Sequence, residues 1–321
     1  MRRFAQRCVA AAMCAGLLGC AASGVASDET IERPLLSARQ TLSGARLGTL
    51  PGFAFGSGAR ATPSAYMAFL APSAAVARNN IVYVFDRGHR QLFRFDPAQQ
   101  SMTRFTDYGG NVTGMAVAPD LSLYVADAGA QQVLHYSWDG RPLPRLVHDT
   151  VLARPVAVCV DAATGRVFVA DSLYNHVVIF DSLGRAQQTL KSQEARSIES
   201  MARGPDGLYL VDRLSRQVVV MGLDGRDRYA LGEGTLNDPQ AIAVDRFNCV
   251  FVSDAFDNSI KVYEGGQLTA RFGGSGATPG RFNHIAFLSI DQDTLYVADS
   301  LNARVQSFHI APPAARGPGH D

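Results

Sequence analysis

A short segment that ends in aspartate recurs six times along this chain at nearly constant spacing. Each copy has an aromatic residue, two apolar or small residues and Asp, and successive copies lie 41, 44, 41, 42 and 45 residues apart. The six aspartates are Asp86, Asp127, Asp171, Asp212, Asp254 and Asp299. This period is typical of four-stranded propeller blades, so the repeats predict one ring-shaped domain where 321 residues would otherwise allow about two.

The residues around each aspartate predict a β-hairpin. In the clearest copy, Leu295–Phe308, two runs of β-branched and aromatic residues flank a turn that begins with Asp299. A strand of small and β-branched residues precedes each hairpin, as in Pro155–Asp161, and suits an innermost strand that neighbouring blades bury. A turn with Gly or Asp and an outer strand such as Leu268–Phe272 complete the unit. The chain therefore predicts an all-β fold, a six-bladed β-propeller with four-stranded blades.

The sixth unit has no fourth strand of its own, because Ala311-Pro312-Pro313 follows its hairpin. Upstream of the first unit, Phe53–Ala59 closely resembles Arg271–Ala277, the outer strand and following loop of the fifth unit. We therefore expect an N-terminal strand around Phe53–Phe55 to complete the last blade, so that the ring closes without an open sheet edge.

The N-terminus has the pattern of an exported, lipid-modified protein. Three arginines precede the apolar run Val9–Leu18, which is too short to span a bilayer. The next residues, Leu17-Leu18-Gly19-Cys20, resemble the lipobox of bacterial lipoprotein precursors. The resemblance implies that Cys20 is lipidated and becomes the first residue of a protein anchored to the outer membrane. A secretory signal cleaved near Val25–Ser27, which would give a secreted or periplasmic protein, is the alternative.

The expected organisation is a signal peptide over 1–19, an anchor cysteine and tether over 20–52, the propeller over 53–310 and a disordered tail over 311–321. Removal of the signal leaves 27 basic and 29 acidic residues without a polybasic run, so nothing favours a nucleic-acid partner. Cys159 and Cys249 remain in different, non-adjacent units, which argues against a disulfide and for two small buried side chains.

The repeats resemble NHL repeats. Asp171–Phe180 (D-S-L-Y-N-H-V-V-I-F) and Asp299–Phe308 (D-S-L-N-A-R-V-Q-S-F) match that pattern closely, and the resemblance covers about residues 53–310. The pattern is not that of WD repeats, because the chain has one Trp and no Gly-His…Trp-Asp pairs. The resemblance implies a six-bladed propeller, and such propellers are mostly binding platforms for proteins, glycans or RNA. Similar propellers include metal-dependent lactonases, arylesterases and an amidating lyase, so the fold leaves the activity open.

The six aspartates are expected to shape turns. Each lies at a strand end, where its carboxylate can accept backbone N–H groups of its own turn, and the six are spread around the ring. Replacing one of them with Ala is then expected to cost about 1 kcal/mol, as loss of a capping interaction does.

Four arginines are candidates for ligand binding. The turns that follow the aspartates lie on the face that propellers use for ligands, and Arg87, Arg90, Arg213 and Arg216 occupy equivalent turns of units one and four, which face each other across the ring. Guanidinium groups suit the recognition of carboxylates or phosphates. Solvated arginines paired with nearby acids are the alternative.

Polar residues precede the innermost strands of several units and are expected to surround the channel mouth. Glu199, Asn237 and Asp238 are candidate ligands of a calcium ion, which needs several converging oxygen atoms. Gln240 and His284 are further candidates for ligand contact. The histidines lack zinc-type spacing, and neither a nucleophile elbow nor a phosphate loop is present.

Together these features predict an envelope lipoprotein whose propeller, a monomer, is a binding or assembly module for a protein or glycan. The rigid ring would present variable loops on one face. No cofactor is required by this hypothesis. The alternative is a calcium-dependent hydrolase of lactones or esters at the channel, with calcium as its cofactor.

Overall fold

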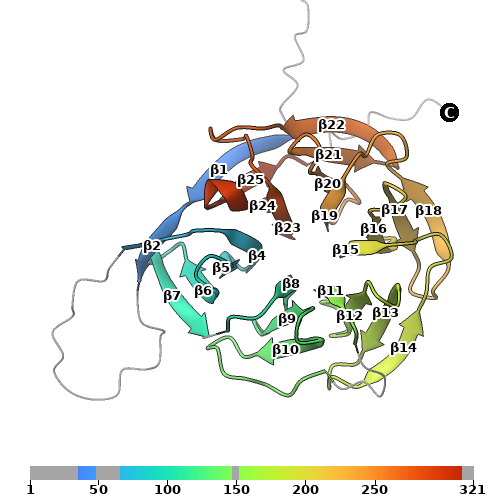
Figure 1. The fold of residues 1–321 in the computed structure, drawn as a ribbon, viewed down its shortest axis with the longest axis horizontal. Helices are drawn as coiled ribbons and strands as arrows, with labels where there is room; N and C mark the ends of the chain where they lie inside the picture. Colours follow the sequence, from blue (N-terminus) through green and yellow to red (C-terminus); the bar gives the residue numbers. More distant parts are fainter. Residues whose placement is uncertain (1–34, 48–65, 107, 147–151, 313–321) are drawn as a thin grey trace, which may run out of the picture. The chain divides into compact units, whose positions relative to one another are not determined.

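The computed structural model describes residues 35–47, 66–106, 108–146 and 152–312. These residues form sheets of mainly antiparallel strands placed radially around a central axis, as Figure 1 shows. The only helical element in the described ranges is a 3₁₀ turn, η1 (Ser300–Asn302). The predicted all-β fold, a six-bladed propeller, is therefore confirmed. No helix among the described residues is long and apolar enough to cross a bilayer.

Each blade begins with its innermost strand. The first three comprise β4 (Pro72–Arg78), β5 (Ile81–Asp86), β6 (Gln91–Asp96) and β7 (Ser101–Thr106); β8 (Val112–Val117), β9 (Leu123–Asp127) and β10 (Gln132–Tyr136); and β11 (Pro155–Val160), β12 (Val167–Asp171), β13 (His176–Phe180) and β14 (Ala186–Leu190). The last three comprise β15 (Ile198–Gly204), β16 (Gly207–Asp212), β17 (Gln217–Met221) and β18 (Asp227–Leu231); β19 (Pro239–Val244), β20 (Val250–Asp254), β21 (Ser259–Glu264) and β22 (Gln267–Gly273); and β23 (Ile285–Asp291), β24 (Thr294–Asp299), β25 (Arg304–Ile310) and β1 (Leu36–Leu42).

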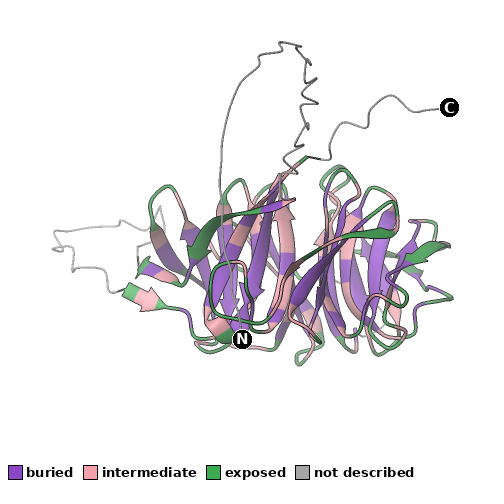
Figure 2. Ribbon diagram, turned by 90° about the horizontal axis from the view of Figure 1, so that it is seen from above, coloured by how far each residue is buried: buried purple, intermediate pink, exposed green. Residues whose placement is uncertain are grey.

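The middle strands of the blades make up the core. β12 has the burial pattern of a strand covered on both faces, because every one of its residues is buried between two neighbouring blades. Outer strands such as β14 are buried only at one end. Figure 2 shows the same distribution in side view, with buried strands crossing the ring and exposed residues in the loops of its two faces. Functional side chains are therefore found in the loops.

The outer strand of the last blade differs from the sequence prediction. β1 pairs antiparallel with β25, with Leu36 opposite Ile310 and Leu42 opposite Val305. The sequence predicts that Phe53–Phe55 pairs with the outer edge of β25. That prediction is wrong, because β1 occupies this edge and β24 the other. Phe53–Ala59 lie outside the described residues. Only the two ends of β1 are buried, so its sequence lacks the alternation of apolar and polar residues that predicts a strand, and it resembles a tether.

The N-terminal segment also joins the last blade to the first. After β1, β2 (Gly44–Leu47) pairs in parallel with β7 and antiparallel with β3 (Tyr66–Ala68). Leu42 and Ala45 belong to one buried cluster with Phe93 of the first blade and Val305 of the last. The segment 36–47 is thus a clasp between the two ends of the ring.

The second blade has three strands in the described part of the chain, β8 to β10, where four were expected. The turn at Asp139-Gly140 follows β10, but beyond it only an isolated bridge joins Tyr136 and Pro142. The outer edge of β10 therefore has no regular partner strand among the described residues.

Candidate functional site

The six repeated aspartates are buried structural residues. Each side chain is at most 1% exposed. Asp171 shows the arrangement: one oxygen accepts the N–H groups of Ala153 and Arg154, both at 2.7 Å, and the other accepts those of Leu173 and Tyr174 at 3.0 and 3.1 Å. The carboxylate thus joins its own turn to the loop that leads into the innermost strand, here called the approach loop. The prediction that these aspartates shape turns is confirmed.

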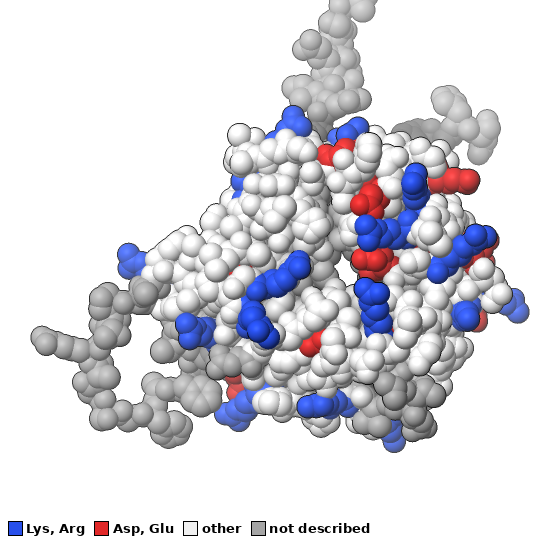
Figure 3. All heavy atoms as spheres, in the orientation of Figure 1, with Lys and Arg blue, Asp and Glu red and all other residues white. Residues whose placement is uncertain are grey.

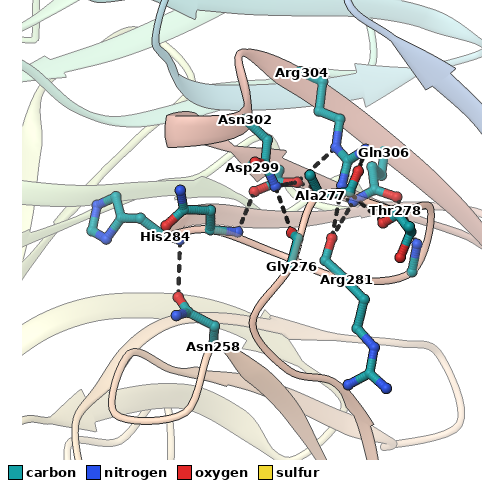
Figure 4. Close-up of polar contacts among 12 residues, drawn as sticks. Asn258, Gly276, Ala277, Thr278, Arg281, His284, Asp299, Asn302, Arg304 and Gln306 are labelled. Carbon is teal, nitrogen blue, oxygen red and sulfur yellow. Dashed lines mark hydrogen bonds and ion pairs between the residues drawn. The ribbon is translucent and has the colours of Figure 1, made fainter.

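In the last blade the same position carries a buried ion pair. Figure 4 shows Asp299 accepting hydrogen bonds from Arg304 at 2.7 Å, Asn302 at 2.9 Å and Gln306 at 3.1 Å. Arg304 also donates to the carbonyl of Ala277 at 2.6 Å, which fixes the approach loop. The polar side chains of Asp299, Asn302, Arg304 and Gln306 are therefore engaged within the blade and its approach loop.

The turns after the aspartates and the approach loops together form one face of the ring, here called the Asp-turn face. Figure 3 shows this face, with a hollow at the centre of the ring, mixed acidic and basic side chains over β15–β20 and a basic patch over β5 and β6. The opposite face carries the turns that end the innermost strands and begin the outermost ones.

Large apolar side chains are exposed at one repeated position of the Asp-turn face. The residue two places after the aspartate is Leu173, Leu214, Phe256 and Leu301 in the third to sixth blades, and these side chains are between 66% and 75% exposed. A fifth exposed residue, Leu70, lies in the approach loop of the first blade. We call these five residues the apolar arc. Sequence reasoning missed the arc, although four of its members are visible once the repeats are aligned.

Leu70 takes the place of the missing side chain in the first blade. The residue two places after Asp86 is Gly88, and a Cβ atom there would overlap the Cβ of Leu70. The first blade therefore presents its apolar group from the neighbouring loop. In the second blade the equivalent residue is Gly129, which lines an open depression, so the arc spans five blades and is interrupted at the sixth position of the ring.

The structure separates the four candidate arginines. Arg213 Nε donates to Asp238 Oδ1 at 2.8 Å, and this hydrogen bond raises the pKa of the guanidinium. Arg87 and Arg90 line the depression between the first two blades. Arg216 is exposed in the turn of the fourth blade. The four therefore do not share one site.

The candidate metal ligands are held by other interactions. Asp238 Oδ1 accepts hydrogen bonds from Arg213 and, at 3.0 Å, from Gln240 Nε2. The half-buried Glu199 contributes to the raised pKa of Arg213, behind the stronger hydrogen bond and charge of Asp238. In the ranges described, no group of three His, Cys, Asp or Glu side chains is close enough to hold an ion. A calcium ion at Asp238 would have to displace a guanidinium, so these residues do not fit the ion well.

Asn237 and His284 contribute backbone groups to the face. The N–H of Asn237 donates to Asp254 at 2.8 Å. The N–H of His284 donates to Asn258 at 2.9 Å, while its imidazole points away from the Asp299 network (Figure 4). His284 has a φ of 65°, so the loop places its side chain through a left-handed conformation.

The channel holds a cavity of about 220 Å³ between the six innermost strands. Small and apolar side chains line most of it, with Arg78, Arg203 and Asp291 toward the face opposite the Asp turns. Burial raises the pKa of the Cys159 thiol, which also lines the cavity, to about 12, so this thiol is not an activated nucleophile. None of the ligand and metal candidates from the sequence lines this cavity.

Comparison with known proteins shows the fold alone. No family model matches the chain, and no curated protein sequence matches it. Among solved structures, virginiamycin B lyase from Staphylococcus aureus is 10% identical, with a TM-score of 0.57 over 75% of this chain and 96% of that one. A putative gluconolactonase is 14% identical, with a TM-score of 0.58 over 75% and 89% of the two chains. A chain of a nidogen–laminin complex is 17% identical, with a TM-score of 0.54 over 65% and 82%.

Proposed function

We propose that the chain is a binding or assembly module, an NHL-type propeller whose Asp-turn face docks a protein partner. The apolar arc carries this proposal. Five large apolar side chains, each at least 57% exposed, lie on one face of a rigid ring. Exposed apolar side chains repeated on one face favour that face as an interaction site, and a rigid scaffold presents them without ordering cost.

A protein is a better partner for this arc than a glycan. Sugars are recognised largely through stacking on aromatic rings and through hydrogen bonds. Four of the five arc residues are leucine, and Phe256 is the one aromatic member. Aliphatic side chains fit the apolar centre of a protein interface, where charged groups are depleted.

The proposal places this module in the cell envelope, attached to the membrane through Cys20, a residue outside the described part of the chain. The basic start, the short apolar run and the lipobox-like Leu17–Cys20 support this location. A Cys20→Ser variant is expected to move from the membrane fraction to the soluble fraction. An unchanged membrane fraction would exclude lipid attachment at this residue.

The partner test compares two faces of the same domain. Tagged mature protein and a Leu214→Ser/Phe256→Ser variant are used to capture cross-linked partners from the source envelope, with quantification by mass spectrometry. The variant is expected to lose specific partners by at least tenfold, since truncated hot-spot residues cost about 2 kcal/mol or more. Leu183→Ser is the matched control, because Leu183 is 70% exposed on the opposite face. Equal capture by all three proteins would refute docking on the arc.

A hydrolase or lyase at the channel is the second candidate, and it rests on the folds of the lyase and the putative gluconolactonase. Calcium-dependent melting that is lost in Glu199→Ala would favour it. The engagement of Asp238 by Arg213 and Gln240 weighs against it, because the carboxylate that would bind the ion is already paired with a guanidinium and hydrogen-bonded to an amide.

A further inference from the structure

The gap in the apolar arc is a depression between the first and second blades. It has a volume of about 640 Å³ and is open to solvent. Its polar lining includes Arg87 and Arg90 from the turn of the first blade, with Tyr108, Asn111 and Gln132 from the second. The basic patch over β5 and β6 in Figure 3 lies at this place. The depression therefore differs in chemistry from the arc that it interrupts.

Arg90 is built into the wall of the depression. Its Nε and Nη2 donate to the carbonyl oxygen of Gly109 at 3.0 and 2.6 Å, so the guanidinium joins the first blade to the approach loop of the second. A Cβ atom on Gly109 would come within 3.1 Å of Arg90 Nε, and the absence of a side chain permits this approach. The remaining N–H groups of Arg90 are left for other acceptors.

The buried carboxylate in the lining is already saturated with donors. Asp127 accepts N–H groups of Gly129 at 2.7 Å, Ala130 at 2.9 Å and Asn111 at 3.2 Å, and it accepts the hydroxyl of Tyr108. Burial and this hydrogen bond raise the pKa of Tyr108, so its hydroxyl stays protonated. Asp127 is thus unavailable to pair with the arginines that line the same depression.

Arg87 supplies the positive charge that a ligand in the depression could pair with. It is exposed, and its guanidinium has no hydrogen-bond or ion-pair partner among the described residues. Arg213, at the equivalent place of the fourth blade, is instead paired with Asp238 at 2.8 Å. The two sides of the Asp-turn face therefore differ: one arginine is neutralised by its own chain, and the other borders an open depression.

We propose that this depression binds a carboxylate of the partner, held by Arg87 and by the free N–H groups of Arg90, while apolar residues beside that carboxylate contact the arc at Leu70. The inference rests on the proposed function, since it describes the same docking face. It identifies the partner segment by its chemistry: one carboxylate flanked by aliphatic side chains. Planar guanidinium groups suit this ligand, because they can donate two parallel hydrogen bonds to a carboxylate.

Short peptides test the pocket without knowledge of the partner. The probes are acetyl-Leu-Glu-Leu-amide, its neutral Gln analogue, and acetyl-Leu-Gln-Leu with a free C-terminal carboxylate, titrated into the isotope-labelled mature domain. NMR would follow the Nε–H signals of Arg87 and Arg90 and the amides of residues 109–111 and 128–130. At least one of the carboxylate peptides is expected to shift these signals and to bind about tenfold or more tightly than the Gln amide. Which of the two binds distinguishes a side-chain carboxylate from a C-terminal one.

Two variants test whether the preference for carboxylate peptides depends on Arg87. Arg87→Gln should abolish the preference for the carboxylate, while Arg216→Gln, which changes an exposed arginine in the turn of the fourth blade, should leave it unchanged. Equal binding of all three peptides, or tighter binding of inorganic phosphate at the same signals, would overturn the proposal. If the carboxylate preference is absent but partner capture still depends on Leu214 and Phe256, the inference fails and the docking function stands.

Discussion

Replacing Asp171 with Ala should destabilise the protein far more than removal of an ordinary turn cap. The side chain is fully buried and accepts four backbone N–H groups, two from its own turn and two from the approach loop of the third blade. A hydrogen bond to a charged acceptor contributes about 1.5–3 kcal/mol, and water can replace part of this at partly buried amides. At about 1 kcal/mol for each of the four amides, Asp171→Ala should lower the free energy of unfolding by about 3–5 kcal/mol.

Asp171→Asn refines the test. The amide keeps one acceptor oxygen and places N–H groups opposite the other pair of backbone donors, so about half of the loss is expected. Urea unfolding followed by circular dichroism measures both variants, and hydrogen exchange at Ala153, Arg154, Leu173 and Tyr174 reports the local effect. Asp181→Ala is the control, because Asp181 accepts two amides of its own turn at a partly exposed position on the opposite face and should matter much less. A loss below about 1 kcal/mol in Asp171→Ala would refute the four-bond reasoning.

Three further predictions follow from the fold. Deleting residues 36–47 should lower the melting temperature strongly and cause aggregation on size-exclusion chromatography. The deletion exposes the edge of β25 and removes Leu42 and Ala45 from the core. An unchanged melting temperature would exclude the clasp. Burial opposes the ionisation of Asp254, but Lys261 and backbone amides hold its pKa below the ordinary value, so its stabilisation is present above about pH 4 and is lost as the pH falls through the folded-state pKa. Lys261→Met should therefore raise the midpoint pH of acid unfolding, and an unchanged midpoint would contradict this. In the folded Cys20→Ser protein, Cys159 should react with iodoacetamide at pH 8 much more slowly than after denaturation, as mass spectrometry would show, whereas equally fast labelling would contradict its raised pKa.

The sequence was sufficient for the architecture and insufficient for the ends of the ring. Middle strands such as β12 are buried on both faces, and that burial forces the apolar residues from which the period of 41–45 residues was read. β1 is an outer strand, so its pairing with β25 depends on backbone hydrogen bonds that any polar residue can make. Phe53–Ala59 resembles the outer strand of the fifth blade, yet resemblance between two segments does not determine which sheet edge either one pairs with.

The sequence predicts which turns hold the candidate arginines, but it does not predict which of the arginines form ion pairs. The four arginines were placed correctly in turns of the first and fourth blades, but whether each is free depends on the loop of the adjacent blade. Asp238, from the fifth blade, neutralises Arg213 of the fourth, while Arg87 borders a depression whose carboxylate, Asp127, is occupied by its own amides and by Tyr108. Such pairs join loops that lie 19 to 25 residues apart in the chain, and no local pattern specifies their geometry.

The residues of the apolar arc are not explained by the packing of the blades. Four blades carry a large apolar residue two places after a buried aspartate, a position that the blade itself does not need, because 66% or more of each of these side chains faces solvent. The first blade has Gly88 there, and the space is taken by Leu70 from another loop, so the surface property is kept although the repeated residue is lost. Folding alone gives no reason for this replacement, since an exposed leucine adds little to the core. The proposed docking function does explain it, since it requires apolar contact around the ring. Under that proposal the second blade, with Gly129 and the arginine-lined depression, is where the partner would offer something other than an apolar side chain.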